Sequence, residues 1–280
     1  MQCRITTLAD NTSGKPHIVG EWGFCALIET NEMTILLDSG AGVGVLHNAE
    51  QLGIDLRNIE TIVLSHAHYD HTGGIQQVLK KIGKDVDVIA PLDLWAEKYN
   101  IKDGLEKARY IGVPYTQAAL ESLGAKFIMT PDPVQLTEHI LTTGEIGIFT
   151  DFEQVGEDYL KIKVGDEFKQ DPCLDDRALI VKTDKGLIVI LGCAHRCLIN
   201  TLHHARKVTG VKQIYMVIGG CHLHDASKEL IVKTIDSLKE FDIQKIGVSH
   251  CTGLSAASMM AAEFGDRFFF NTAGTSITLE

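Results

Sequence analysis

Residues 65–74 read SHAHYDHTGG, and this segment concentrates side chains that bind metals. Three imidazoles and one carboxylate, those of His66, His68, Asp70 and His71, fall within six residues. Two histidines two positions apart can point to one side of an extended loop, and an adjacent Asp-His pair can serve a second ion. Imidazole and carboxylate ligands together suit Zn²⁺, Mn²⁺ or Fe²⁺. The segment therefore predicts a site for two divalent ions.

The residues on either side indicate where this cluster lies. Thr61–Ser65 is a short apolar run rich in β-branched residues, which is typical of a strand buried on both faces. After Gly73 and Gly74, apolar residues recur at helical spacing over 75–82, and Gly83 ends the pattern. The cluster is therefore expected in a strand-to-helix loop, which disfavours a chance cluster of solvated polar residues.

Further strands and helices follow from the hydrophobic pattern. The runs Trp22–Glu29 and Met33–Leu37 predict a β-hairpin. Later in the chain, strands are expected at Leu187–Leu191, Ile214–Ile218 and Ile246–Ser249, and helices at Leu198–Val208 and Leu230–Phe241. Each of these three strands runs into a histidine, which makes His195, His222 and His250 further candidate site residues.

The composition limits which kinds of molecule this chain is expected to bind. The chain has 280 residues, 45% of them hydrophobic, which is enough for a full core. Its 26 basic and 37 acidic residues leave a formal charge of -11, which argues against a nucleic-acid surface. A small-molecule substrate is the expected partner, and the oligomeric state stays open.

The N-terminus and the cysteines bear on localisation. Residues 1–20 contain neither the apolar stretch of a signal peptide nor a run of membrane-spanning length, so we expect a cytoplasmic protein without a membrane association. Seven scattered cysteines do not resemble a disulfide framework, and reduced thiols fit better.

No repeat or linker divides the sequence, so one domain over residues 1–280 is expected. The least regular region, residues 91–152, contains four prolines and four aromatic Trp and Tyr residues. We interpret it as an insertion that covers the site.

The SHAHYDHTGG segment resembles the HxHxDH signature of the metallo-β-lactamase superfamily. Leu36–Gly40 resembles the first motif of that superfamily, whose Asp supports the metal-binding loop by hydrogen bonds. Residues 144–146, 152–153, 192–195, 219–223 and 250–253 are similar to one subfamily, that of the archaeal dihydropterin ribofuranosylaminobenzene phosphate synthase of methanopterin biosynthesis. The resemblance implies a four-layer αββα sandwich, in which two mixed β-sheets lie face to face with helices outside and the metals at one edge.

The resemblance also implies roles for individual residues. His66 and His68 would bind the first metal, Asp70 and His71 the second, and His250 matches a late histidine at a strand end. The usual bridging Asp is absent, since the strand ending at Gly192 leads to Cys-Ala-His at 193–195.

Several groups could take the place of the bridging Asp. His195 is the expected ligand, because the subfamily pattern contains it, and the Cys193 thiolate is the alternative. Asp175 and Asp176 offer a further carboxylate, although a turn cap is the stronger interpretation. His222 is either a third histidine ligand or a contact to substrate.

These residues predict a metal-dependent hydrolase of the α/β class. Two divalent ions, zinc first with manganese or iron as alternatives, would activate a hydroxide for attack on a small ester or phosphate-bearing substrate, pterin-like by resemblance. Asp70 would be both ligand and proton acceptor, and His222 is the second candidate catalytic residue. Two alternatives stay open: an iron-dependent oxidoreductase acting on a thiol or oxygen, and a catalytically silent metal-dependent binding protein.

Overall fold

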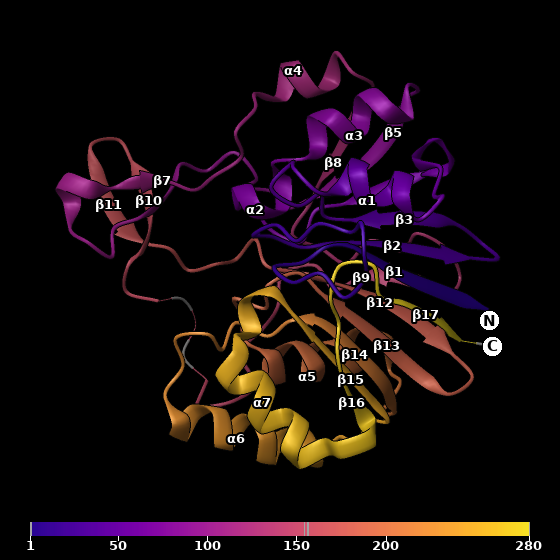
Figure 1. Ribbon diagram of the computed structural model, residues 1–280. Coiled ribbons are helices and arrows are strands. Elements are labelled where there is room, and N and C mark those ends of the chain that lie inside the picture. Colours follow the sequence, from indigo (N-terminus) through magenta and orange to yellow (C-terminus); the bar gives the residue numbers. More distant parts are fainter. Residues whose placement is uncertain (1, 154, 156, 280) are drawn as a thin grey trace.

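Two β-sheets pack face to face at the centre of the computed structural model, which describes residues 2–153, 155 and 157–279 (Figure 1). The first sheet has the order β17-β1-β2-β3-β4-β5-β8. Its strands, in chain order, are β1 (Cys3–Ala9), β2 (Cys25–Thr30), β3 (Thr34–Leu37), β4 (Thr61–Val63), β5 (Val86–Ala90), β8 (Ala125–Met129) and β17 (Ser276–Leu279). Strands β17 to β3 pair antiparallel and β3 to β8 pair parallel, so the sheet is mixed.

The second sheet has the order β16-β15-β14-β13-β12-β9 and is also mixed, with parallel pairing from β16 to β13. Its strands are β9 (Ile140–Thr142), β12 (Ala178–Thr183), β13 (Gly186–Leu191), β14 (Ile214–Gly220), β15 (Lys245–Ser249) and β16 (Phe268–Phe270). Every strand predicted from the sequence is present, and β2 and β3 form the predicted hairpin, with Ala26 opposite Leu37.

Helices cover both outer faces and complete the four layers. On the first sheet lie α1 (Val45–Gln51) and α3 (Ile75–Ile82), and on the second lie α5 (Leu198–Thr209), α6 (Lys228–Lys239) and α7 (Leu254–Phe264) (Figure 1). A buried apolar layer separates the sheets, where Ile28 and Ile35 belong to the same cluster as Ile188 and Ile190. The predicted αββα sandwich is confirmed.

Local sequence explains why α3 forms where it does. Its four apolar residues, Ile75, Val78, Leu79 and Ile82, recur at helical spacing and are all buried. Gly83 then takes a left-handed conformation (φ 67°) and donates its N–H to Leu79, which ends the helix. Shorter helical segments are α2 (Tyr69–Thr72), α4 (Gln117–Glu121), η1 (Leu56–Asn58), η2 (Leu105–Lys107), η3 (His250–Thr252) and η4 (Gly265–Arg267).

A third, antiparallel sheet was not foreseen. It has the order β11-β10-β6-β7 and consists of β6 (Lys98–Asn100), β7 (Arg109–Tyr110), β10 (Leu160–Val164) and β11 (Glu167–Gln170), which extend to the left in Figure 1. Residues 91–152 are therefore not one irregular insertion, since β8 and β9 in this range belong to the two main sheets. The expected boundaries were wrong because the third sheet joins two separate segments of the chain, 98–110 and 160–170.

Among the described residues, no helix combines the length and the apolar character needed to cross a membrane.

Candidate metal centre

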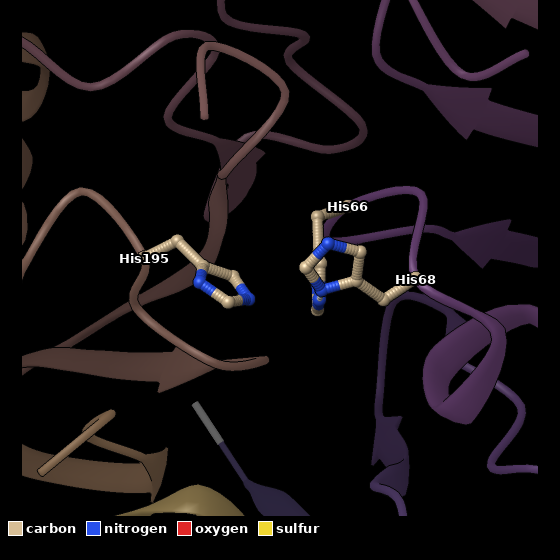
Figure 2. Close-up of side chains that lie close together, drawn as sticks. All are labelled: His66, His68 and His195. Carbon is tan, nitrogen blue, oxygen red and sulfur yellow. Dashed lines mark hydrogen bonds between the residues drawn. The ribbon is translucent and has the colours of Figure 1, made fainter. Parts of the chain in front are cut away.

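The candidate ligands gather where strands of the two main sheets end. His66 and His68 follow β4, while Asp70 lies in α2. From the other sheet, His195 follows β13 and His250 follows β15. Figure 2 shows His195 facing His66 and His68 from the opposite side, so the two halves of the chain meet here.

The first ligand group consists of His66, His68 and His195, whose ligand atoms lie within 4.8 Å of one another. All three residues are at most 7% exposed. His68 Nε2 and both ring nitrogens of His195 have no hydrogen-bond partner among the described residues, which is costly for buried polar atoms. A metal ion would satisfy His68 Nε2 and one of the two His195 nitrogens, so the group fits one.

The protonation of this group also suits a metal. Burial lowers the pKa of His66 and His195, and it lowers the pKa of His68 to about 4. The three rings are therefore neutral at physiological pH, and a neutral imidazole is the form that binds a metal.

The second ligand group consists of Asp70, His71 and His250, again with ligand atoms within 4.8 Å of one another. His250 Nε2 lies 3.2 Å from Asp70 Oδ2, while His250 Nδ1 donates to Asn11 Oδ1 at 2.8 Å. Burial raises the pKa of Asp70, but the hydrogen bond from His250 and the nearby His71 ring outweigh it and hold the pKa below its usual range. The carboxylate is therefore ionised and available to a cation.

Asp38 supports both ligand groups by hydrogen bonds without being a ligand itself. Its Oδ1 accepts the Ser65 N–H, and its Oδ2 accepts both the Ser65 hydroxyl and His71 Nδ1, each at 2.7 Å. Because the Ser65 hydroxyl donates to Asp38, it accepts from His66 Nδ1, 2.9 Å away. Both rings are thus held through Nδ1 with Nε2 turned to the site, where His66 Nε2 lies 3.1 Å from His68 Nδ1. This is the supporting role that the first motif implied.

The Cys193 thiol lies between the two groups. Its Sγ is within 4.8 Å of the ligand atoms of His66 and His71, and it lies 3.2 Å from His71 Nε2. The sequence predicted His195, and not Cys193, at this position of the usual bridging Asp. The structure instead puts His195 beside His66 and His68, because Ala194 takes a left-handed conformation (φ 53°) and turns the chain after Cys193.

His222 forms a further possible ligand group with Cys193 and His195, whose ligand atoms lie within 4.8 Å of one another. The His222 ring centroid is 4.1 Å from that of His195, and its Nε2 forms an ion pair with Glu157. Among the described residues Asp176 joins neither ligand group, and its Oδ2 accepts the backbone N–H of Arg196 at 2.8 Å. Asp176 thus accepts a hydrogen bond from a segment 20 residues away and, among the described residues, not from its own turn. Its Oδ1 is buried without a partner among the described residues, and burial raises the pKa of this carboxyl to about 7.

A buried ion cluster that the sequence did not reveal ties the third sheet to the metal-binding loop. Lys98 of β6 donates from Nζ to Asp171 Oδ2 at 2.6 Å and to Asp175 Oδ1 at 3.0 Å. The other oxygen of Asp175 accepts the N–H of Ala67, between His66 and His68, at 2.9 Å. No local spacing signals this cluster, because Lys98 and Asp171 lie 73 residues apart.

Two cavities open at the centre. One of about 110 Å³ lies over the ligand groups and is lined by Trp22, Tyr69, Arg109 and Tyr159 among others. A larger one of about 680 Å³ lies beside it and shares Tyr159, His195 and His222 with the first. A small molecule therefore has access to the candidate ligands.

Comparisons with known proteins agree with this geometry. A family model described as the metallo-beta-lactamase superfamily matches residues 23–195. The chain is 31% identical over 277 residues to the 7,8-dihydropterin-6-methyl-4-(beta-D-ribofuranosyl)-aminobenzene-5'-phosphate synthase of Methanocaldococcus jannaschii, covering 95% of this chain and 92% of that one. A UPF0173 metal-dependent hydrolase of Lysinibacillus sphaericus is 29% identical over 187 residues, which cover 58% of this chain and 78% of the relative. Among solved structures, Tm1679, described as a metal-dependent hydrolase of the beta-lactamase superfamily, is similar with a TM-score of 0.84 and 26% identity over 99% of both chains.

Proposed function

Because this chain belongs to the metallo-β-lactamase superfamily, we propose that it is a metal-dependent hydrolase with a two-metal centre. The observation that carries the proposal is the pair of ligand groups, His66, His68 and His195 on one side and Asp70, His71 and His250 on the other, with the Cys193 thiol between them. Two relatives described as metal-dependent hydrolases support the reaction class.

The donor atoms favour zinc. Imidazole nitrogens dominate the first ligand group, and the second adds a carboxylate, a combination that zinc, manganese and iron accept. A thiolate from Cys193 would shift the preference towards zinc, because sulfur is a soft ligand. When bound, two such ions lower the pKa of water towards neutrality and stabilise the negative charge that develops on the attacked group.

The residues of the chain then have distinct tasks. Asp70 is ionised and belongs to the second group, so it can orient the attacking water and accept its proton. His222 lies where the two cavities meet, with its ring held towards Glu157, and we assign it to contact with the substrate.

The substrate we propose is a small ester or a phosphate-bearing molecule. Support comes from the archaeal relative, whose name contains a dihydropterin and a 5'-phosphate. The same relative is named a synthase, so the second candidate function is group transfer at the same centre, in which the attacking group is not water.

Hydrolysis by purified protein tests the proposal. The protein is loaded with Zn²⁺, Mn²⁺ or Fe²⁺, desalted, and offered bis-p-nitrophenyl phosphate and p-nitrophenyl acetate. We expect up to two metal equivalents per chain by plasma mass spectrometry and release of p-nitrophenol with at least one metal. If the protein retains no metal, or if it hydrolyses neither substrate with any of the metals, the result would count against a hydrolase.

A further inference from the structure

The larger cavity has the size and position to hold the part of a substrate that does not react. Its volume of about 680 Å³ is in the range of small-molecule sites, and it meets the smaller cavity at His195 and His222. Leu198, Leu223 and Leu230 supply an apolar wall. A substrate whose reacting group lies at the metal ligands can therefore extend into this space.

The charge of this cavity is negative. Its lining contains the carboxylates of Glu153, Glu157, Asp158 and Asp225 against one ammonium, that of Lys102. Lys102 forms an ion pair with Asp225 at 2.7 Å. The Glu153 carboxylate accepts the N–H groups of Ile199 and Asn200 at 2.8 Å each, and so caps α5. Asp158 and the second carboxylate oxygen of Glu157, whose first oxygen pairs with His222, are left to face a ligand.

Buried polar atoms in this lining have no partner. Glu157 pairs with His222 through Oε1, while its Oε2 is buried without a hydrogen bond among the described residues. Thr234 of α6 is 1% exposed, and its Oγ1 is likewise unpartnered. A buried acceptor without a donor is costly, so these oxygens favour a ligand that brings N–H donors.

We propose that this cavity binds the non-reacting end of the substrate as a cationic group with paired N–H donors, of the amidine type, on an apolar body. The proposal rests on the proposed function, because the adjacent centre supplies the reaction. An anionic group placed here would face Glu157 and Asp158 and be repelled. Any phosphate of the substrate therefore belongs at the metal ligands and not in this cavity.

Two probes of the same shape test this preference. Benzamidine is cationic with paired N–H donors, whereas benzamide is neutral and has fewer donors. Binding of each to the metal-loaded full chain is measured by calorimetry and by ligand-observed NMR. We expect benzamidine to bind at least tenfold more tightly, and we expect Glu157→Gln with Asp158→Asn to bring the two affinities to within about twofold, since the carboxylates supply the difference.

The control variant Glu50→Gln with Asp87→Asn changes net charge equally at two exposed positions outside the cavity, and it should keep the preference. Asp158→Asn alone, at an exposed position, should reduce the preference without affecting the fold, as melting temperature will show. Equal binding of both probes to wild type, or an unchanged preference in the double variant, overturns the inference. Because no turnover is measured, preferred binding of benzamidine alongside failed hydrolysis would count against the proposed function alone.

Discussion

The Cys193 sulfur lies between the two groups of candidate ligands, in a place where a carboxylate could bridge two ions through two oxygens. Burial raises the pKa of this thiol, so the metal-free protein holds it protonated, and metal binding would have to displace the proton. The neighbouring Cys251 thiol donates to the Cys193 carbonyl at 3.4 Å, which fixes the loop that carries the sulfur. Occupancy of the centre should therefore depend on pH and on this one residue.

Replacement of Cys193 tests whether the sulfur is a ligand. We expect Cys193→Ala to lose at least one of two metal equivalents under a chelator concentration that wild type withstands, because one donor shared by both groups is gone. The measurement is metal content after chelator titration. Cys3→Ala, which removes a buried thiol on β1 far from the ligand groups, should keep both equivalents. If Cys193→Ala keeps both ions while His195→Ala loses one, the thiol does not bind metal.

Asp70 is the residue on which hydrolysis should depend most. Asp70→Asn keeps the shape but removes the charge that accepts a proton, so the rate of hydrolysis should fall by about a hundredfold or more. Initial rates of the metal-loaded variant give the answer. Asp85→Asn, at an exposed position, serves as the matched control, and a near wild-type rate for Asp70→Asn would contradict attack by ionised water.

At the scale of elements, the third sheet is attached to the centre by charge. Lys98 comes from β6, and its side chain and those of Asp171 and Asp175 are at most 2% exposed. Tyr69 N–H also donates to Ile111 O at 2.8 Å, beside the end of β7. The buried Lys98, Asp171 and Asp175 cluster therefore fixes the third sheet, which lines the smaller cavity, to the loop that carries His66 and His68.

Removal of the Lys98 ammonium should lower both the stability of the protein and its affinity for metal. Lys98→Met leaves two buried carboxylates without a cation, which should lower the free energy of unfolding by roughly 3–5 kcal/mol. Without Lys98, the Asp175 carboxylate is less well fixed as the acceptor of the Ala67 N–H. The affinity of the first ligand group for its ion should therefore fall as well. Chemical denaturation and chelator competition measure the two effects.

Lys161→Met on β10 of the same sheet is the matched control, because its ammonium is exposed and contacts Gln170. It should change stability by less than about 1 kcal/mol. A Lys98→Met protein with wild-type stability and wild-type metal affinity would show that the buried cluster does not support the loop.

At the scale of the molecule, each ligand group draws side chains from both main sheets. Bound ions therefore hold the sheets together, and a ligand that binds only the folded state raises stability by about 2.7 kcal/mol at a hundredfold excess over its dissociation constant. Removal of metal with a chelator should lower the melting temperature, and re-addition of Zn²⁺ should restore it. His66→Ala should show a smaller shift. The same melting temperature with and without metal would mean that the groups do not bind ions in the folded state.

The parts that the sequence predicted are those encoded by neighbouring residues. Helix α3 was predicted with its observed limits because four apolar residues and Gly83 specify it locally. The cluster from His66 to His71 was found because its spacing is short. The third sheet was missed, although the alternation of Leu160–Val164 indicates a strand, since nothing local pairs it with β6. The exchange of places between Cys193 and His195 depends on the left-handed backbone of Ala194, a conformation that alanine rarely adopts and that its identity does not reveal.

Because the ligands are divided between the two sheets, the two ligand groups are completed in a fixed order as the ribosome makes the chain. His66 and His68 emerge early, but the first group lacks a member until residue 195 has been made and β13 has paired with its neighbours. The second group waits longer, for residue 250 at the end of β15. A nascent chain shorter than this exposes several histidines and thiols without a complete set of ligands, so the cell must supply metal after residue 250 has been made or protect the earlier ligands until then.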